Sequence, residues 1–132
     1  MAGAGVTQTG MTEARRTVQA LPRAISAALR GVAHLTAVRI RDGAKQRLLA
    51  QTAGTGRTAA AIAVHEDDEQ QQFRVESKAV RPAPANLPIW LEYGTVKMAA
   101  RPYMRPAAEA QRDAYARASE AAATRAAESV GL

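Results

Sequence analysis

Alanine supplies more than half of the apolar residues of this chain, which limits the core that the chain can build. Hydrophobic residues make up 47% of the sequence, but 32 of them are alanine, and Leu, Ile, Val and Phe together number only 22 of 132 residues. Burial of apolar area, at about 25 cal/mol per Å², is the main driving force for folding, and an alanine side chain buries little. We therefore expect a single domain over residues 1–132 that either has loosely held ends or completes its core against other subunits.

Charge is unevenly distributed along the sequence. The chain carries a net charge of +6, of which residues 1–60 contribute +7, residues 61–100 contribute −2 and residues 101–132 contribute +1. A basic front and an acidic middle can bind copies of the same chain or an oppositely charged neighbour. The basic excess also leaves open contact with nucleic acid.

Several functional classes are disfavoured by what the sequence lacks. The chain has no cysteine, which argues against disulfide frameworks, zinc ribbons and thiol catalysis. No apolar run approaches the ~20 residues that span a bilayer, so we expect no membrane partner. The first residues do not resemble a secretory signal, and we expect a cytoplasmic location during synthesis. We also expect neither an enzyme nor a cofactor, because His34 and His65 lie in different elements and no catalytic spacing is present.

The first half of the chain predicts an arm, a long helix and a loop. Residues 1–11 are small and polar with three glycines, which predicts a mobile arm. Apolar residues at steps of three or four predict a helix from about Pro22, which suits a first helical turn, to Leu49. The face of this helix comprises Ile25, Leu29, Val32, Thr36, Ile40, Ala44 and Leu48. Residues 52–58 predict a loop, which lacks the lysine of a phosphate-binding loop.

The middle of the chain predicts a β-hairpin with an acidic tip. Residues alternate between apolar and polar around 61–65 and again around 73–76, on either side of a polar stretch. The tip has four consecutive carboxylates: Glu66, Asp67, Asp68 and Glu69. We expect a solvated turn without a metal, although the charges could also repel DNA phosphates or dock on a basic surface such as the arginine-rich first helix of a neighbour.

The last part predicts a proline-rich loop followed by a helix. Residues 79–88 are proline-rich and favour extended backbone. A helix is expected from about Pro106 to Ser129, and its many alanines permit close helix packing. The predicted fold class is therefore α+β, with a long N-terminal helix, a small antiparallel sheet with a hairpin, a proline-rich loop and a long alanine-rich C-terminal helix.

Residues 88–107, which we call the loop motif, contain the most specific pattern in the sequence. Glu-aromatic-Gly-Thr is followed by a short basic loop and then by Ala-Arg-Pro-aromatic-Met-Arg-Pro-Ala. The motif residues to which we assign an assembly role are Trp90, Glu92, Tyr93, Gly94, Thr95, Arg101, Pro102, Tyr103, Arg105 and Pro106. The pattern resembles that of the neck, or head–tail joining, proteins of long-tailed bacteriophages, which are tail-completion components. The resemblance extends more weakly over residues 20–125.

The resemblance implies a structural protein of the virion, with residues 12–130 as the neck-protein domain. Such a protein would form a ring of identical subunits, six by resemblance, that joins the tail to the DNA-filled head. Its partners would be its own copies, neighbouring connector and tail proteins, and DNA that passes through the lumen without specific binding. Alternatives are a basic nucleic-acid-binding module, a tail terminator, or a counterpart in a gene-transfer particle.

The loop motif also has a direct physical interpretation. Gly94 allows a positive φ at a chain reversal, and Trp90 and Tyr103 supply large faces for burial. We expect Glu92 to pair with Arg101 or Arg105 and so to brace the loop.

Overall fold

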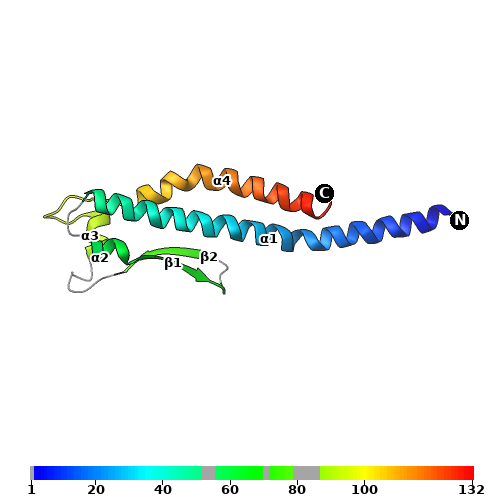
Figure 1. Ribbon diagram of the computed structural model, residues 1–132, viewed down its shortest axis with the longest axis horizontal. Helices are drawn as coiled ribbons and strands as arrows, with labels where there is room; N and C mark the ends of the chain where they lie inside the picture. Colours follow the sequence, from blue (N-terminus) through cyan, green and yellow to red (C-terminus); the bar gives the residue numbers. More distant parts are fainter. Residues whose placement is uncertain (1, 52–55, 70–71, 79–86) are drawn as a thin grey trace. The chain divides into compact units, whose positions relative to one another are not determined.

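The computed structural model describes residues 2–51, 56–69, 72–78 and 87–132, with side chains from residue 11 onwards (Figure 1). The fold is α+β, as predicted: a long N-terminal helix, a two-stranded antiparallel sheet and a long C-terminal helix. The chain divides into two compact units. We call Met1–Val32 with Ala116–Leu132 the helical unit, and Ala33–Tyr115 the mixed unit. The expectation of a single domain stays a prediction.

Helix α1 (Ala2–Gln51) starts much earlier than the sequence predicted. The expected arm is helical from Ala2 onwards, and Pro22 lies inside the helix rather than in its first turn. An interior proline costs about 3 kcal/mol of helix stability. The helix is continuous through it, and Leu21 and Ile25, four residues apart on either side of Pro22, are half-buried on one face.

Two other boundaries differ from the prediction. Helix α2 (Gly56–Ala60) occupies the end of the expected loop at 52–58, and the rest of that loop lies outside the described residues. Helix α3 (Leu87–Tyr93) begins inside the expected proline-rich loop, of which residues 79–86 are not described. Pro88 is tolerated there because the N–H of a residue in the first helical turn has no helical partner.

The predicted hairpin is present in the mixed unit. Strand β1 (Ile62–Asp67) pairs antiparallel with β2 (Gln72–Ser77), and the register places Val64 opposite Val75 and Glu66 opposite Phe73. The apolar residues of this register share the face that carries Ile62 into the core. Glu66 and Asp67 therefore belong to β1 itself, and only Asp68 and Glu69 lie in the turn.

One hydrophobic cluster forms the core of the mixed unit. It joins residues from α1, α2, β1, α3 and the start of α4 (Met104–Ser129): Ala44, Leu48, Ala59, Ile62, Leu91, Tyr103 and Ala107. The predicted face of α1 is confirmed at Ala44 and Leu48, which are fully buried, and at Ile40, which packs against the cluster. Only Leu48, Ile62, Leu91 and Tyr103 are larger than alanine, so the core is as thin as the composition implied.

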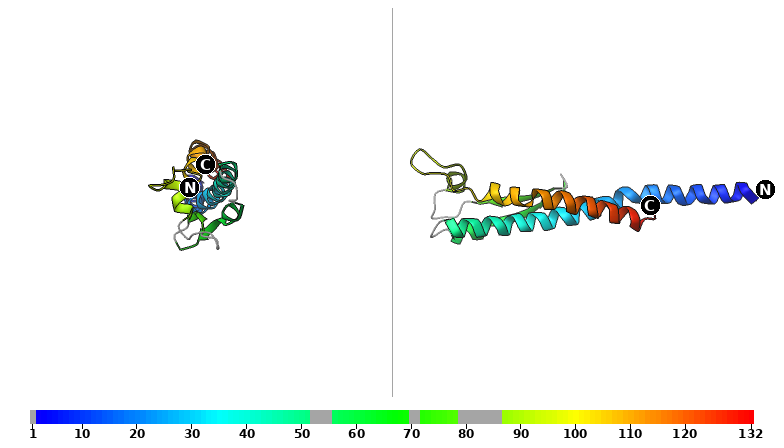
Figure 2. Two further views of the ribbon diagram at one scale, coloured as in Figure 1. Left: turned by 90° about the vertical axis from the view of Figure 1, so that its left-hand side faces the viewer. Right: turned by 90° about the horizontal axis from the view of Figure 1, so that it is seen from above.

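Two helices make up the described part of the helical unit. The second part of α4 lies beside α1 in both Figures 1 and 2, and α1 extends beyond the end of α4. Ala122 and Ala126 are the buried residues of this pair. Among the described residues, no helix is both long enough and apolar enough to cross a membrane.

Candidate assembly site

Glu92 occupies the centre of the loop motif, and its carboxylate caps helix α4. One oxygen, Oε2, accepts hydrogen bonds from the backbone N–H groups of Tyr103 and Met104, both at 3.0 Å. The other oxygen, Oε1, accepts the N–H of Arg105 at 2.9 Å. The predicted bracing role therefore acts through backbone N–H groups at the start of α4, where a negative charge is favoured by the helix dipole.

The cap accounts for every free donor at this helix start. The first four N–H groups of an α-helix have no partner inside the helix, and here they belong to residues 103–106. Glu92 takes the first three, and Pro106 has no N–H to satisfy. The three free N–H groups at the start of α4 are therefore all bound by one carboxylate, which comes from α3.

Gly94 ends α3 in a conformation that other residues rarely adopt. Its φ is +77°, and its N–H donates to the carbonyl of Trp90 at 2.7 Å. A Cβ at this position would lie 2.8 Å from the backbone nitrogen of Ala100 and 2.9 Å from the carbonyl oxygen of Met98. The glycine that the sequence singled out is therefore required both by the turn and by the close approach of the returning chain.

The returning chain is held by backbone hydrogen bonds. Thr95 donates its N–H to the carbonyl of Met98 at 2.8 Å, and its hydroxyl accepts the N–H of Lys97 at 3.2 Å. Arg101 donates its N–H to the carbonyl of Leu91 at 2.6 Å. Gln51, at the end of α1, donates from its side chain to the carbonyl of Pro102 at 3.2 Å. The loop is consequently fixed to both α3 and α1.

Tyr103 joins the loop motif to the hairpin. Its ring is buried in the core, and its hydroxyl donates to Ser77 Oγ, at the end of β2, at 2.7 Å. Burial raises the pKa of Tyr103 above its ordinary value of 10.0; the Ser77 hydrogen bond lowers it, and the charge of Glu92 raises it further. The expectation that Tyr103 supplies a buried face is confirmed, and Trp90 is half-buried.

Other side chains of the same motif point to solvent. Tyr93 and Ile89 of α3 are 67% and 58% exposed, and Val96 in the loop is fully exposed. The guanidinium of Arg105 lies 5.7 Å from the centre of the Tyr93 ring, within range of a cation–π interaction. The motif thus combines a tightly bonded interior with an apolar exterior.

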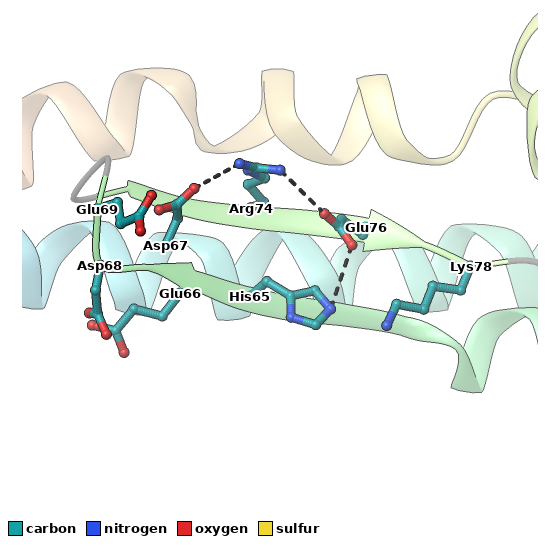
Figure 3. Close-up of a pocket in the computed structure, with 8 residues that line it drawn as sticks. All are labelled: His65, Glu66, Asp67, Asp68, Glu69, Arg74, Glu76 and Lys78. Atoms are coloured by element: carbon teal, nitrogen blue, oxygen red, sulfur yellow. Dashed lines mark hydrogen bonds and ion pairs between the residues drawn. The ribbon is translucent and has the colours of Figure 1, made fainter.

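The acidic hairpin is the second predicted site, and Figure 3 shows its side chains. They line an open pocket of about 420 Å³. Arg74 pairs with Asp67 at 2.7 Å and approaches Glu76 at 3.9 Å, and His65 lies 3.5 Å from Glu76. Asp68 and Glu69 are exposed at the turn, as expected. Across the described ranges, no group of three or more His, Cys, Asp or Glu residues is placed to hold a metal ion.

The sequence reasoning missed the helix cap and the pairs that cross the hairpin, Arg74 with Asp67 and His65 with Glu76. Charge pairing suggested guanidinium partners for Glu92, whereas the partners are peptide groups 11 to 13 residues further along. The sequence did contain a signal for this cap. A proline in the first turn marks the start of a helix, where free N–H groups lie, and Pro106 is close enough in sequence for Glu92 to reach them.

Comparisons with protein families, with curated proteins and with solved structures found no match to this chain.

Proposed function

We propose that this protein is a structural subunit of the head–tail junction of a long-tailed bacteriophage or a related particle, where copies form a ring around the DNA passage. The observation that carries the proposal is the loop motif. Its residues resemble those of neck proteins, and in the structure they fix a rigid loop that presents Ile89, Tyr93 and Val96 to solvent. Exposed apolar side chains on a rigid loop suit contact with a protein partner.

The thin core supports the same proposal. Among the described residues, the buried side chains larger than alanine belong to the mixed unit, while Met11 and Val18 of the helical unit are exposed. A subunit that completes its burial only within an assembly is stabilised by that assembly.

The test is genetic, and it measures whether complete particles with joined heads and tails are formed. Deletion of the coding sequence should leave DNA-filled heads and separate tails, and a wild-type copy should restore joining. Val96→Asp should fail to restore joining because it places a charge in the contact surface, whereas Ala121→Asp, at an exposed position of α4, should restore it. Normal joining without the protein would overturn the proposal.

DNA binding is the second candidate, favoured by the exposed arginines Arg15, Arg16 and Arg23 of α1. Titration of duplex DNA at two salt concentrations separates the candidates. A nucleic-acid-binding module should bind with a steep salt dependence, whereas a ring subunit should show little binding at physiological salt.

A further inference from the structure

The segment of α1 from Met11 to Arg23, which we call the basic arm, exposes both apolar and basic side chains. Met11 and Val18 are 62% and 63% exposed and lie two helical turns apart. Arg15 lies between them on the same face, because residues three and four apart are neighbours on a helix. The arm carries three arginines and one glutamate. It therefore presents a narrow apolar stripe with Arg15 at its edge, while Arg16 and Arg23 lie on the opposite side of the helix.

This stripe continues an interface that is already used within the helical unit. Apolar residues recur at alternating steps of three and four along α1, at Met11, Ala14, Val18, Leu21, Ile25, Ala28 and Val32. Such a pattern is typical of a helix that packs on another helix. The last four residues are half-buried and the first three are exposed, and Figure 2 shows that α1 extends beyond the end of α4. The first part of the stripe is thus suited to a partner outside this part of the chain.

The mixed unit has a matching apolar groove. A groove of about 350 Å³ lies between α1, β2 and Tyr115 of α4. Ile40, Phe73 and Val75 contribute its apolar walls, and Tyr115 is 42% exposed at its side. The groove has room for one or two aliphatic side chains.

The hairpin that contributes Gln72, Phe73 and Val75 to this groove is acidic. The strand register places Glu66 opposite Phe73 and Asp67 opposite Gln72, both of which line the groove, and Asp68 and Glu69 follow in the turn. The hairpin from Ile62 to Ser77 carries five acidic residues and one arginine. An apolar groove on an acidic hairpin complements an apolar stripe that has an arginine at its edge.

We propose that the basic arm of one copy docks on the groove and acidic hairpin of a second copy, with Val18 or Met11 in the groove and Arg15 beside Asp68 and Glu69. The inference rests on the proposed function for its biological setting. The contact joins two different surfaces. A pair of copies therefore still has one free basic arm and one free groove, and each can bind a further copy. Repetition of such a heterologous contact closes into a ring when the rotation between copies allows it.

Cysteine cross-linking tests the contact directly, because the chain has no cysteine of its own. Val18→Cys in one copy and Gln72→Cys in an isotope-labelled second copy should form a disulfide between chains under mild oxidation. Leu132→Cys, at an exposed terminal position, is the control partner for Gln72→Cys. Equal yields from the two mixtures would overturn the proposal.

Charge reversal provides an independent test in solution. Arg15→Glu with Arg16→Glu, or Asp68→Lys with Glu69→Lys, should weaken self-association roughly tenfold at low ionic strength, where surface charges are least screened. The chain with all four changes should recover association, because the reversed surfaces again attract. Arg112→Glu with Arg117→Glu, and Glu120→Lys with Glu128→Lys, make the same charge changes at exposed positions of α4 and should have little effect.

The outcomes separate this contact from the virion role. The docking contact would be overturned if self-association stayed weak in the variant with all four changes. It would also be overturned if the α4 control variants lost self-association to the same extent. Binding of a DNA duplex that is lost in the arm variant, without cross-linking to the hairpin, would also overturn it and would assign the arm to nucleic acid. Cross-linking together with normal head–tail joining in the deletion strain would retain the contact and remove the proposed function.

Discussion

Leu48, Ile62 and Tyr103 of the mixed unit are each less than 2% exposed, whereas the buried residues of the helical unit, among those with described side chains, are Ala122 and Ala126. Complete burial of a large side chain contributes about 1.5–3 kcal/mol, and an alanine methyl contributes well under half of that. Buried hydroxyl groups are also better paired in the mixed unit than in the helical unit. The Tyr103 hydroxyl has a partner in Ser77, while the buried Ser119 hydroxyl has none among the described residues.

The difference indicates how the two units divide their roles. The mixed unit holds the large buried side chains and the Tyr103–Ser77 hydrogen bond, and it fixes the loop motif and the hairpin. The helical unit has one apolar stripe on α1 and buried alanines on α4. We expect it to open more readily and to gain stability when a partner covers the basic arm.

The largest effect should follow removal of the Tyr103 ring. Tyr103→Ala should lower the free energy of unfolding of the mixed unit by about 3–5 kcal/mol, because it leaves a cavity in the core and an unpaired Ser77 hydroxyl. Urea unfolding measures the change. Tyr115→Ala removes the same atoms from a position that is 42% exposed and should cost under about 1.5 kcal/mol. Similar losses for the two variants would show that complete burial of the Tyr103 ring is not what stabilises the mixed unit.

Loss of the helix cap should come next. Glu92→Ala should destabilise the mixed unit by about 1–3 kcal/mol, since three backbone N–H groups lose their acceptor. Glu109→Ala, an exposed carboxylate further along the same helix, should cost about 0.5 kcal/mol. Arg105→Ala keeps its backbone N–H, so it should leave the cap in place. An Arg105→Ala loss as large as that of Glu92→Ala would instead support side-chain pairing.

Stability at alkaline pH should report on the Tyr103 hydroxyl. The raised pKa means that the folded state keeps this proton at a pH where the unfolded chain releases it. The contribution is therefore complete below about pH 10 and is lost as pH rises through the folded pKa. Tyr103→Phe should remove this pH dependence and cost about 1 kcal/mol at neutral pH, through loss of the Ser77 hydrogen bond. An unchanged alkaline slope in Tyr103→Phe would assign the dependence to other groups.

The smallest effect should have the opposite sign. Ser119→Ala in the helical unit removes a buried hydroxyl without a described partner and introduces a better helix former. It should raise protection of the α4 amides between 116 and 129 against hydrogen exchange by about 0.5 kcal/mol and leave the mixed unit unchanged. Thr124→Ala removes a hydroxyl that donates to the carbonyl of Glu120 at 3.0 Å and serves as the control. Loss of protection in Ser119→Ala would show that this hydroxyl has a partner in solution.

The elements with strong local signals were predictable from the sequence. The hairpin follows from alternation around Ile62 and Phe73, and α4 follows from its alanines and from Pro106 in its first turn. The start of α1 was not predictable, because Pro22 and three early glycines oppose a helix locally, while the apolar stripe that continues it is sparse.

The sequence identified the residues that matter at the candidate site, but not the hydrogen bonds that they form. Gly94, Glu92 and Tyr103 all have the structural importance that the motif indicated. Sequence shows which side chains carry charge, so it suggested arginine partners for Glu92. It does not show where a fold will place free backbone N–H groups, and those groups are what the carboxylate binds.

The cap on α4 also bears on the order in which the chain can fold. The partners of Glu92 lie only 11 to 13 residues away along the chain, and a loop of that length closes in roughly 10–100 ns. The Gln51–Pro102 bond, by contrast, spans 51 residues. Because short loops lose less entropy on closure, we expect α3, the Gly94 turn and the first turn of α4 to form together early. The end of α1 and the hairpin would then add to a preformed corner of the protein, and substitutions at Glu92 would slow folding more than they speed unfolding.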